Sequence, residues 1–343
     1  MNKEHKYPYK WYLKDSYPKT NGLNVFGTFI CGGGSTMGYK LAGFNHLGGV
    51  EIDPKIADVY KVNHNPKYLY TEDIREFNKR TDLPDELYNL DLLDGSPPCS
   101  TFSMAGAREK GWGKEKTFRE GQTLQTLDDL VFVYCDTIIK LQPKVFILEN
   151  VKGIIQGNAK VYSKNIVKKM TNAGYTVQVF MLNAASMGVP QKRERVFFIG
   201  YKKELKYPKL KMAFNEKAIT FGEIDNDTIG KPITGGMLKY WKVCPEGYSL
   251  SKVHPKGNYF GSHKIGLNDT ANTIIASSSS PLLHNKKPNY LSDNNICQIG
   301  TYPLDYNFKN IEPKYLIGMS VPPIMTAQIA NQIAIQWFKL TGS

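Results

Sequence analysis

Short apolar runs alternate with helical periods over residues 24–200, and this alternation constrains the fold more than any other feature of the sequence. Because strands that alternate with helices form βαβ units, the pattern predicts an α/β fold with a doubly wound, mostly parallel sheet. We expect strands at residues 25–30, 49–52, 90–93, 145–148, 176–182 and 195–200. We expect helices at residues 36–44, from 54 onward with proline in the first turn, from 128 onward and up to about 173.

The sequence changes character after Tyr201. A basic, proline-punctuated segment, KKELKYPKLK, leads into a region rich in Gly, Ser, Asn and Pro that runs to about residue 290 without a long helical period. Helical periodicity returns only at residues 322–339. We therefore expect an N-terminal extension, a large discontinuous domain, and a smaller strand-and-loop domain with its return segment. The predicted bounds are residues 1–22, residues 23–201 plus 318–343, and residues 202–317, in that order.

Charge and cysteine content restrict the class of protein. The sequence has 44 Lys and Arg against 31 Asp and Glu, a formal net charge of +13, which favours a polyanion such as nucleic acid, although lysines also simply solvate surfaces. Five cysteines without a C-x-x-C pair argue against a disulfide framework and a zinc site, so we expect reduced thiols, a cytoplasmic location and no metal. No apolar run is long enough to span a bilayer and no signal peptide is recognisable, so we expect no membrane partner.

A glycine-rich turn and two acids predict a cofactor site. The run FICGGGSTMG places the turn between a strand and a helix, where a ligand can approach the backbone. Glu51 follows the next strand, 17 residues after Gly34, and Asp73 follows a further strand end. Ligands of open α/β sheets bind at the carboxyl ends of strands, so these places converge. Together they indicate a cofactor that contains a nucleoside, although either acid alone would be ordinary at a solvated surface.

Three further motifs supply reactive side chains. In LLDGSPPCSTFS, two prolines stiffen the backbone before Cys99 and aim its thiol. ILENV ends a neighbouring strand with Glu149, whose alternative role is a surface pair with Lys152. In GVPQKRERV, Arg193 and Arg195 alternate at strand spacing and are expected to share one face of a strand. A thiol and a carboxylate at one pocket suit attack on an electron-poor ring.

In chain order, these motifs resemble those of the C5-cytosine DNA methyltransferases over residues 24–337. The resemblance is carried by SPPC with FS, by LENV, by GVPQKRER, and near the end by NDTANTI, YPLDYNF and GMSVPP. It implies S-adenosylmethionine as cofactor, S-adenosylhomocysteine as product, and double-stranded DNA as partner. The implied reaction is methylation of C5 in a flipped-out cytosine of a short site, which residues 202–291 would read.

The resemblance also implies catalytic roles. Cys99 would add to C6 of the cytosine, while Glu149 holds or protonates N3. Arg195 would contact O2 with support from Arg193. Substrate contacts are implied for Ser96, Pro97, Pro98, Asn150 and Gln191.

The implied cofactor contacts lie in several motifs. Gly32 and Gly34 would hold the methionine part and Glu51 the ribose. Ile52 and Asp73 would contact the adenine. The remaining implied contacts are Phe29, Ile30, Ser35, Ile74, Ser320 and Val321.

The sequence departs from the family pattern at three positions. Thr28 and Ile30 stand where the family usually has an aspartate and an aromatic residue, and Met319 stands where asparagine commonly follows the glycine. We therefore expect weaker cofactor binding without loss of activity.

Rival interpretations explain less of the sequence. A branch of the family that methylates transfer RNA typically has threonine where Ser103 follows Phe102. A weakened relative that only binds DNA is opposed by the intact reactive residues, and a nicotinamide oxidoreductase leaves PPC, ENV and QKRER unexplained. We expect a monomer of bacterial or phage origin, and the resemblance admits a cognate restriction endonuclease that acts separately.

Overall fold

The computed structural model describes residues 5–98, 115–116, 125–126 and 129–340. The chain forms two compact units, each assembled from three segments. The sheet unit consists of Pro18–Leu182, Glu194–Met212 and Ile329–Ser343. The short-strand unit consists of Met1–Tyr17, Asn183–Arg193 and Ala213–Gln328. The chain therefore leaves and re-enters each unit, and neither is one continuous segment.

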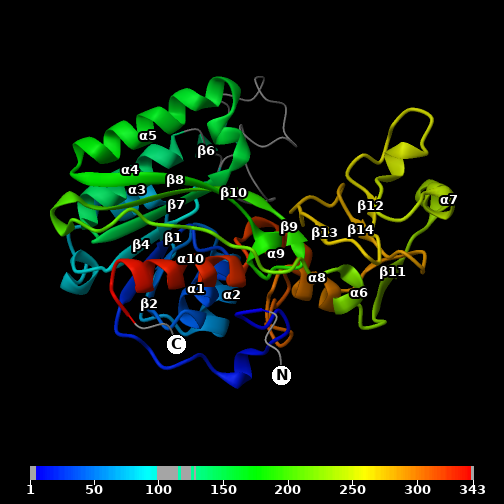
Figure 1. Cartoon of the computed structure of the whole chain (residues 1–343), viewed down its shortest axis with the longest axis horizontal. Coiled ribbons are helices and arrows are strands. Elements are labelled where there is room, and N and C mark those ends of the chain that lie inside the picture. The colour runs from blue at the N-terminus through cyan, green and yellow to red at the C-terminus, as the bar shows by residue number, and fades with distance from the viewer. Residues whose placement is uncertain (1–4, 99–114, 117–124, 127–128, 341–343) are drawn as a thin grey trace. The chain divides into compact units, whose positions relative to one another are not determined.

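A seven-stranded sheet forms the centre of the sheet unit, in the order β3-β2-β1-β4-β7-β10-β8 (Figure 1). Every pair from β3 to β7 is parallel, and β10 runs antiparallel to β7. The predicted mostly parallel sheet is thus confirmed. Its strands are β1 (Asn24–Thr28), β2 (Asn45–Val50), β3 (Tyr68–Tyr70), β4 (Leu92–Gly95), β7 (Val145–Val151), β8 (Tyr175–Asn183) and β10 (Glu194–Lys202), and a separate antiparallel pair is formed by β5 (Glu115–Lys116) and β6 (Gln125–Thr126).

Helices cover both faces of this sheet, with α1 and α2 on one side and α4 and α5 on the other (Figure 1). The helices are α1 (Gly34–Leu41), α2 (Pro54–His64), α3 (Ile74–Lys79), α4 (Leu130–Leu141) and α5 (Lys160–Asn172), with 3₁₀ turns η2 (Asp85–Tyr88), η3 (Lys152–Ile155), η4 (Gly157–Ala159) and η6 (Lys203–Leu205). Helix α2 begins at Pro54, as predicted. Asp53 caps it, because its Oδ1 accepts a hydrogen bond of 2.9 Å from the Lys55 N–H.

Several predicted boundaries in this unit differ from the structure, including the strands expected at residues 25–30 and 90–93, and two of the differences have a clear physical cause. The helix expected at residues 36–44 ends at Leu41, and Gly43, with a φ of 83°, then turns the chain toward the next strand. The strand expected at residues 49–52 is β2, which starts with Asn45 opposite Asn24 of β1. Because β2 starts with the polar pair Asn45 and His46, backbone pairing and not an apolar run determines where it begins.

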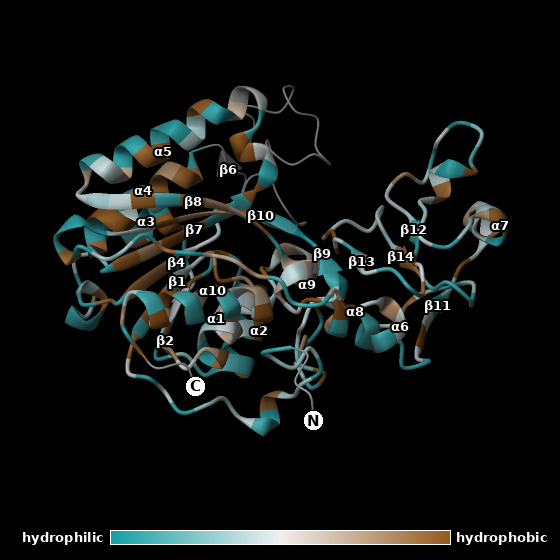
Figure 2. Ribbon diagram, in the orientation of Figure 1, coloured by the Kyte–Doolittle hydropathy of each residue, from teal (hydrophilic) through white to brown (hydrophobic). Residues whose placement is uncertain are grey.

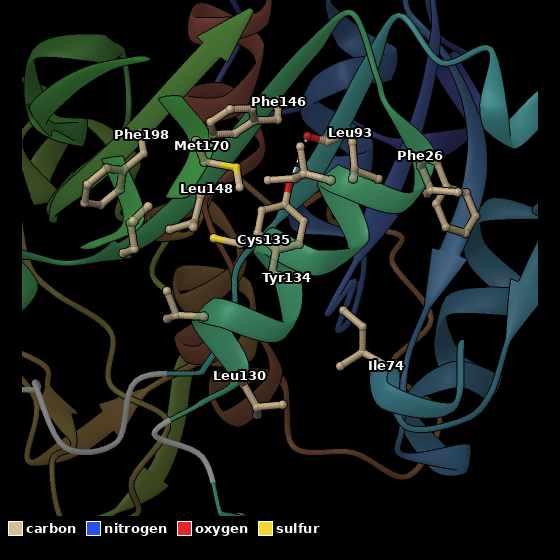
Figure 3. Packing of buried hydrophobic residues seen from close by; sticks show 14 of the residues in the cluster. Phe26, Ile74, Leu93, Leu130, Tyr134, Cys135, Phe146, Leu148, Met170 and Phe198 are labelled. Carbon is tan, nitrogen blue, oxygen red and sulfur yellow. Dashed lines mark hydrogen bonds between the residues drawn. The ribbon is translucent and has the colours of Figure 1, made fainter. Parts of the chain in front are cut away.

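The core of the sheet unit is a continuous cluster of buried apolar side chains (Figure 3). The Tyr134 hydroxyl on α4 lies 3.0 Å from the carbonyl oxygen of Leu93 and 2.7 Å from that of Ile147, so one polar group serves both β4 and β7. Phe146 and Leu148 of β7 are fully buried beside it. Figure 2 shows these central strands as predominantly hydrophobic and α5 as mixed, as expected for a buried sheet beneath an amphipathic helix.

The short-strand unit has little regular structure. It contains a four-stranded sheet, β11-β15-β14-β12, and a parallel pair of β9 and β13. The strands are β9 (Gln191–Lys192), β11 (Ile229–Pro232), β12 (His263–Lys264), β13 (Ala271–Asn272), β14 (Leu282–Leu283) and β15 (Asn289–Leu291). One small apolar cluster in this unit has five buried members, Ile233, Trp241, Cys244, Leu250 and Leu283.

Helices in the short-strand unit correct the prediction that helical structure returns only after residue 321. They are α6 (Phe221–Ile224), α7 (Gly235–Val243), α8 (Asp293–Ile299) and α9 (Pro313–Met319), with turns η1 (Leu13–Asp15), η5 (Ala184–Met187) and η7 (Leu250–Lys252). Helix α7 fully buries only Trp241, spans nine residues and begins with two glycines, so it is too short and too glycine-rich to give a long helical period in the sequence. Helix α10 (Pro323–Gln336), which includes the boundary between the units, confirms the helix predicted near the end of the chain.

Residues 5–17 of the predicted N-terminal extension belong to the short-strand unit and pack within it, whereas residues 18–22 belong to the sheet unit. The Trp11 indole N–H donates to the Thr301 carbonyl oxygen at 2.9 Å, and the Asp305 carboxylate accepts from the backbone N–H groups of Leu13 and Lys14. These hydrogen bonds anchor residues 11–14 to the segment around residues 301–305. None of the helices among residues 5–340 that the structure describes has the length and apolarity to cross a membrane.

Candidate active site

A buried ion pair lies at the junction of β7 and β10. Arg195 Nε is 2.9 Å from Glu149 Oε1, with the two side chains 15% and 11% exposed. The antiparallel register sets Arg195 opposite Val151 and Phe197 opposite Glu149, which brings the two charged groups together. Burial lowers the pKa of Arg195, and the Glu149 carboxylate opposes that shift. Lys152 pairs with Glu194 instead, so the surface pair considered for Glu149 is wrong.

The proline loop starts beside the same strand. The Asn150 side-chain amide donates to the Pro97 carbonyl oxygen at 3.3 Å, which ties the end of β7 to the loop that follows β4. Pro97 is buried, whereas Ser96 and Pro98 are half-buried. Cys99, with Phe102 and Ser103, lies outside the described residues. The Glu149 motif and the start of the proline loop are thus neighbours in the sheet unit.

Asp94 is a buried acid that the sequence analysis did not select. The Tyr39 hydroxyl on α1 donates to Asp94 Oδ1 at 3.0 Å, and the Thr28 hydroxyl donates to the Asp94 carbonyl oxygen at 3.2 Å. Burial raises the pKa of Asp94 to about 7, the Glu149 charge adds to the rise, and hydrogen bonds from Tyr39 and Ser35 oppose it. The available signal was an acid at the end of the apolar run LLDG.

The glycine-rich turn after β1 has an unusual backbone. Phe29, Cys31 and Gly33 have positive φ angles of 55°, 48° and 77°. A side chain at Gly33 would collide with the ring of His64, the last residue of α2, whose Nε2 lies 3.3 Å from the Gly32 carbonyl oxygen. Burial lowers the pKa of His64 to about 3, so its ring stays neutral under the loop. His64 was also missed, because a histidine that ends a helix carries no motif.

Glu51 connects this turn to the end of β2. Its Oε2 accepts the Cys31 N–H and its Oε1 accepts the Asp53 N–H, each at 2.9 Å. Burial raises the pKa of Glu51 to about 7, partly offset by those hydrogen bonds. A carboxylate has about four acceptor sites, so Glu51 can still accept hydrogen bonds from ligand hydroxyls, and these remaining acceptor sites fit the ribose of a nucleoside cofactor.

The other predicted cofactor residues of the sheet unit lie near strand ends, in varied surroundings. Asp73 caps α3 by accepting the Arg75 N–H at 2.8 Å and pairs with the Arg75 guanidinium at 3.1 Å. Ile74 and Ile30 are buried, whereas Ser35, Ile52 and Phe29 are half-buried. The predicted residues of this unit therefore gather at the carboxyl ends of β1, β2, β3, β4 and β7, the usual ligand edge of such a sheet.

The predicted site residues of the short-strand unit brace its own backbone. Arg193 donates from Nη1 to the Ile274 carbonyl oxygen and from Nη2 to that of Gly318, each at 3.1 Å. Gln191 donates to the Ile299 carbonyl oxygen at 3.2 Å and accepts the Ile274 N–H at 3.0 Å. These bonds join QKRER to the NDTANTI and GMSVPP segments within one unit.

The remaining predictions for this unit have mixed outcomes. The Ser320 hydroxyl accepts the Tyr302 hydroxyl proton at 2.7 Å, and Val321 is buried. The single strand expected for the two arginines is wrong, because β9 ends at Lys192, β10 begins at Glu194 and Arg193 lies between them. Across the described ranges, His, Cys, Asp and Glu side chains form no group of three or more that could hold a metal ion.

Comparison with known proteins gives matches over most of the chain. A profile of the family described as C-5 cytosine-specific DNA methylase matches residues 23–334. The Type II methyltransferase M.NgoPII of Neisseria gonorrhoeae is 32% identical over 221 residues, covering 62% of this chain and 59% of that protein. M1.HphI of Haemophilus parahaemolyticus is 24% identical over 348 residues, covering 95% and 91%. This chain spans about half the length of several relatives, including 48% of M.FnuDI of Fusobacterium nucleatum.

Solved structures share the fold. The DNMT2 mutant of Spodoptera frugiperda has a TM-score of 0.65 at 16% identity, covering 91% of this chain and 99% of that one. A prophage-encoded protein of Escherichia coli has a TM-score of 0.63 at 22% identity, covering 92% and 99%. At these identities the likeness establishes the α/β architecture.

Proposed function

Because the chain belongs to the C-5 cytosine-specific DNA methylase family, we propose that it transfers a methyl group from S-adenosylmethionine to C5 of a cytosine in duplex DNA. The observation that carries the proposal is the buried Glu149–Arg195 pair beside the proline loop. A carboxylate held by a guanidinium at this position can bind the N3–H edge of a protonated or polarised pyrimidine. A surface acid without a fixed partner would not be oriented for that contact.

The chemistry requires covalent activation of the base. C5 of cytosine is too weak a nucleophile to take a methyl group unaided, so the Cys99 thiolate adds to C6 and makes C5 enamine-like. Glu149 favours the addition at N3, and Arg195 orients Glu149 and contacts O2. S-Adenosylmethionine supplies an electrophilic methyl group on a sulfonium. A base then removes the C5 proton, and elimination at C6 releases the Cys99 thiolate.

The cofactor residues follow from the edge of the sheet. Glu51 would accept hydrogen bonds from the ribose hydroxyls, since its two backbone donors leave acceptor sites open. The turn at Gly32 and Gly34 would hold the methionine part, with Ser35 beside it. Asp73 and Ile52 would contact the adenine. The target cytosine must leave the DNA double helix to reach Cys99 and Glu149, so base flipping is part of the proposal.

The biological setting follows from the named relatives. Several are Type II methyltransferases, and one is described as an orphan methyltransferase of Bacillus phage SPR. We therefore infer that the protein modifies one short DNA site, with a separate cognate endonuclease where one is encoded beside it. The short-strand unit would supply the recognition of that site.

The decisive experiment is methylation mapping in a host that lacks cytosine methylation. The chain and its Cys99→Ser variant are expressed separately, and host DNA is read by bisulfite sequencing. Methylation of one short motif with the wild type and none with Cys99→Ser is the expected result. If bisulfite sequencing of host RNA shows methylation only in transfer RNA, the substrate is RNA and not DNA. Binding of DNA without methylation by either protein would mean a weakened DNA-binding relative.

A further inference from the structure

Phe260 is exposed to solvent although it lies in a well-defined turn of the short-strand unit, between η7 and β12. Its side chain is 79% exposed, the highest value among the large hydrophobic residues that the structure places at the surface. Single exposed hydrophobic residues are ordinary. The surroundings of this residue are not ordinary.

The backbone of the turn is fixed on both sides of Phe260. The Ser249 hydroxyl lies 3.0 Å from the Tyr259 carbonyl oxygen and 2.7 Å from that of Phe260, and the Ser262 N–H donates to the Tyr259 carbonyl oxygen at 3.0 Å. A Cβ at Gly261 would collide with the Ser280 side chain, so that position is close-packed. The phenyl ring is therefore held outward by an ordered turn.

The neighbouring aromatic residue is arranged in the opposite way. Tyr259 is half-buried, with its ring 5.9 Å from that of Tyr240 and 5.6 Å from that of His254. Hydrophobicity alone would bury the phenyl group of Phe260 and leave the hydroxyl-bearing ring of Tyr259 in water. The inverted arrangement indicates that Phe260 contacts a partner.

Charge around the turn identifies the chemistry of that partner. Residues 229–291 contain eight Lys, no Arg, and two acids, Glu246 and Asp269, a net charge of 8 − 2 = +6. Lys252 and Lys256 are exposed in the same segment as Phe260. The serines at positions 277–279 are also exposed. Their turn is tied to the segment after Phe260, because the His263 N–H donates to the Pro281 carbonyl oxygen at 3.1 Å. An exposed apolar ring in a segment rich in lysines and hydroxyls is complementary to stacked bases between phosphates.

We propose that Phe260 inserts its ring between stacked base pairs of duplex DNA while exposed lysines of the same segment, Lys252 and Lys256, contact the phosphates. This inference rests on the proposed function, since it gives the short-strand unit a specific mode of engaging the DNA substrate. Insertion unstacks one step and pays for part of the distortion through ring–base contact.

The test uses the full chain and a duplex that carries the motif mapped by bisulfite sequencing, with 2-aminopurine at each step of the motif in turn. Phe260→Ala is expected to weaken binding about 10- to 100-fold, the range for loss of one base stack, and to abolish the fluorescence rise at one step. Phe260→Trp keeps affinity within about threefold. Because the ring is uncharged, the salt slope of binding stays unchanged, whereas Lys256→Ala lowers that slope by about one.

Val243 supplies the control, because it is a 67% exposed apolar side chain elsewhere in the same unit, and Val243→Ala should leave DNA binding and fluorescence unchanged. Equal thermal unfolding of all four variants shows that each is folded, as expected for exposed side chains. If Phe260→Ala binds DNA with wild-type affinity and gives the wild-type fluorescence, the inference is overturned. If that variant still methylates DNA, the proposed function stands. Loss of a concentration-dependent dimer in Phe260→Ala, with DNA binding intact, assigns the ring to a second copy and overturns it too. A wild type that binds no duplex defeats both proposals.

Discussion

The sheet unit and the short-strand unit belong to one chain, but different interactions stabilise the interior of each. In the sheet unit, a continuous apolar cluster joins seven strands to helices on both faces (Figure 3). In the short-strand unit, strands of two to four residues surround a small cluster, and many bonds from side chains to backbone fix the loops. Dense packing orients groups at strand ends to within small tolerances, whereas loops accept sequence change at low cost. We therefore expect reaction chemistry to depend on the first unit and recognition on the second.

Two arginines two residues apart show the same contrast at close range. Arg195 of the sheet unit binds the Glu149 carboxylate, whereas Arg193 of the short-strand unit binds the carbonyl oxygens of Ile274 and Gly318. One guanidinium orients an acid and the other holds backbone segments together. The partners of a side chain, and not its place in a motif, decide which role it has.

The largest effect is expected from Glu149→Gln, which tests whether the sheet unit carries the chemistry. The amide oxygen can still accept a hydrogen bond from Arg195. A neutral amide cannot supply the negative charge that stabilises a protonated N3, so kcat/KM for methylation should fall about 10³-fold. Because the substitution leaves the Arg195 charge without its counter-ion, the free energy of unfolding should also fall, by about 3 kcal/mol, so the rate is measured where chemical unfolding shows the variant folded. A methylation rate within tenfold of the wild type would separate Glu149 from the reaction.

A matched pair of leucines tests the difference in packing. Leu148 and Leu283 are both 0% exposed, one in the large cluster and one in the small cluster. Leu148→Ala should lower the free energy of unfolding by about 4 kcal/mol and Leu283→Ala by about 2 kcal/mol, because a sparse cluster relaxes around the cavity. Amide hydrogen exchange should show the second loss confined to the short-strand unit. Equal losses in both units for Leu283→Ala would contradict the comparison.

The pH dependence of stability tests Asp94. Between its ordinary pKa near 4 and the raised pKa of about 7, the folded protein binds a proton that the unfolded chain releases, so stability falls as the pH rises through that window. Asp94→Asn removes this loss. Relative to the wild type, its free energy of unfolding should rise by about 2 kcal/mol between pH 5 and pH 8. A difference between Asp94→Asn and the wild type that stays constant over this pH range would argue against the raised pKa.

The smallest effect is expected from Arg193→Lys. A lysine cannot reach both carbonyl oxygens with the geometry of a guanidinium, so one charged hydrogen bond is lost, at a cost of about 1.5 kcal/mol. Hydrogen exchange should report the loss near Ile274 and Gly318. Arg195→Lys, its counterpart in the sheet unit, should reduce methylation more than stability. The reverse ranking would exchange the roles assigned to the two arginines.

The sequence by itself determined the class of sheet, the helices from Pro54 and near the C-terminus, and the motifs on which the family resemblance rests. These follow from periodicity and turn chemistry, which are local properties of the chain. The same reasoning missed α7, which buries a single tryptophan, and placed β2 several residues late, because the register of that strand is set by β1.

Only the tertiary structure decided which side chains share an environment. Asp94 lies in LLDGSPPCSTFS without a role that the sequence indicates, and His64 belongs to no motif, yet one is a buried acid beside Glu149 and the other lies under the glycine turn. Likewise, the alternation in QKRER did not reveal that its two arginines bind different partners in different units. Burial, pKa and ion pairing depend on groups that are distant in sequence and meet only when the sheet and the loops are assembled, so no local pattern encodes them.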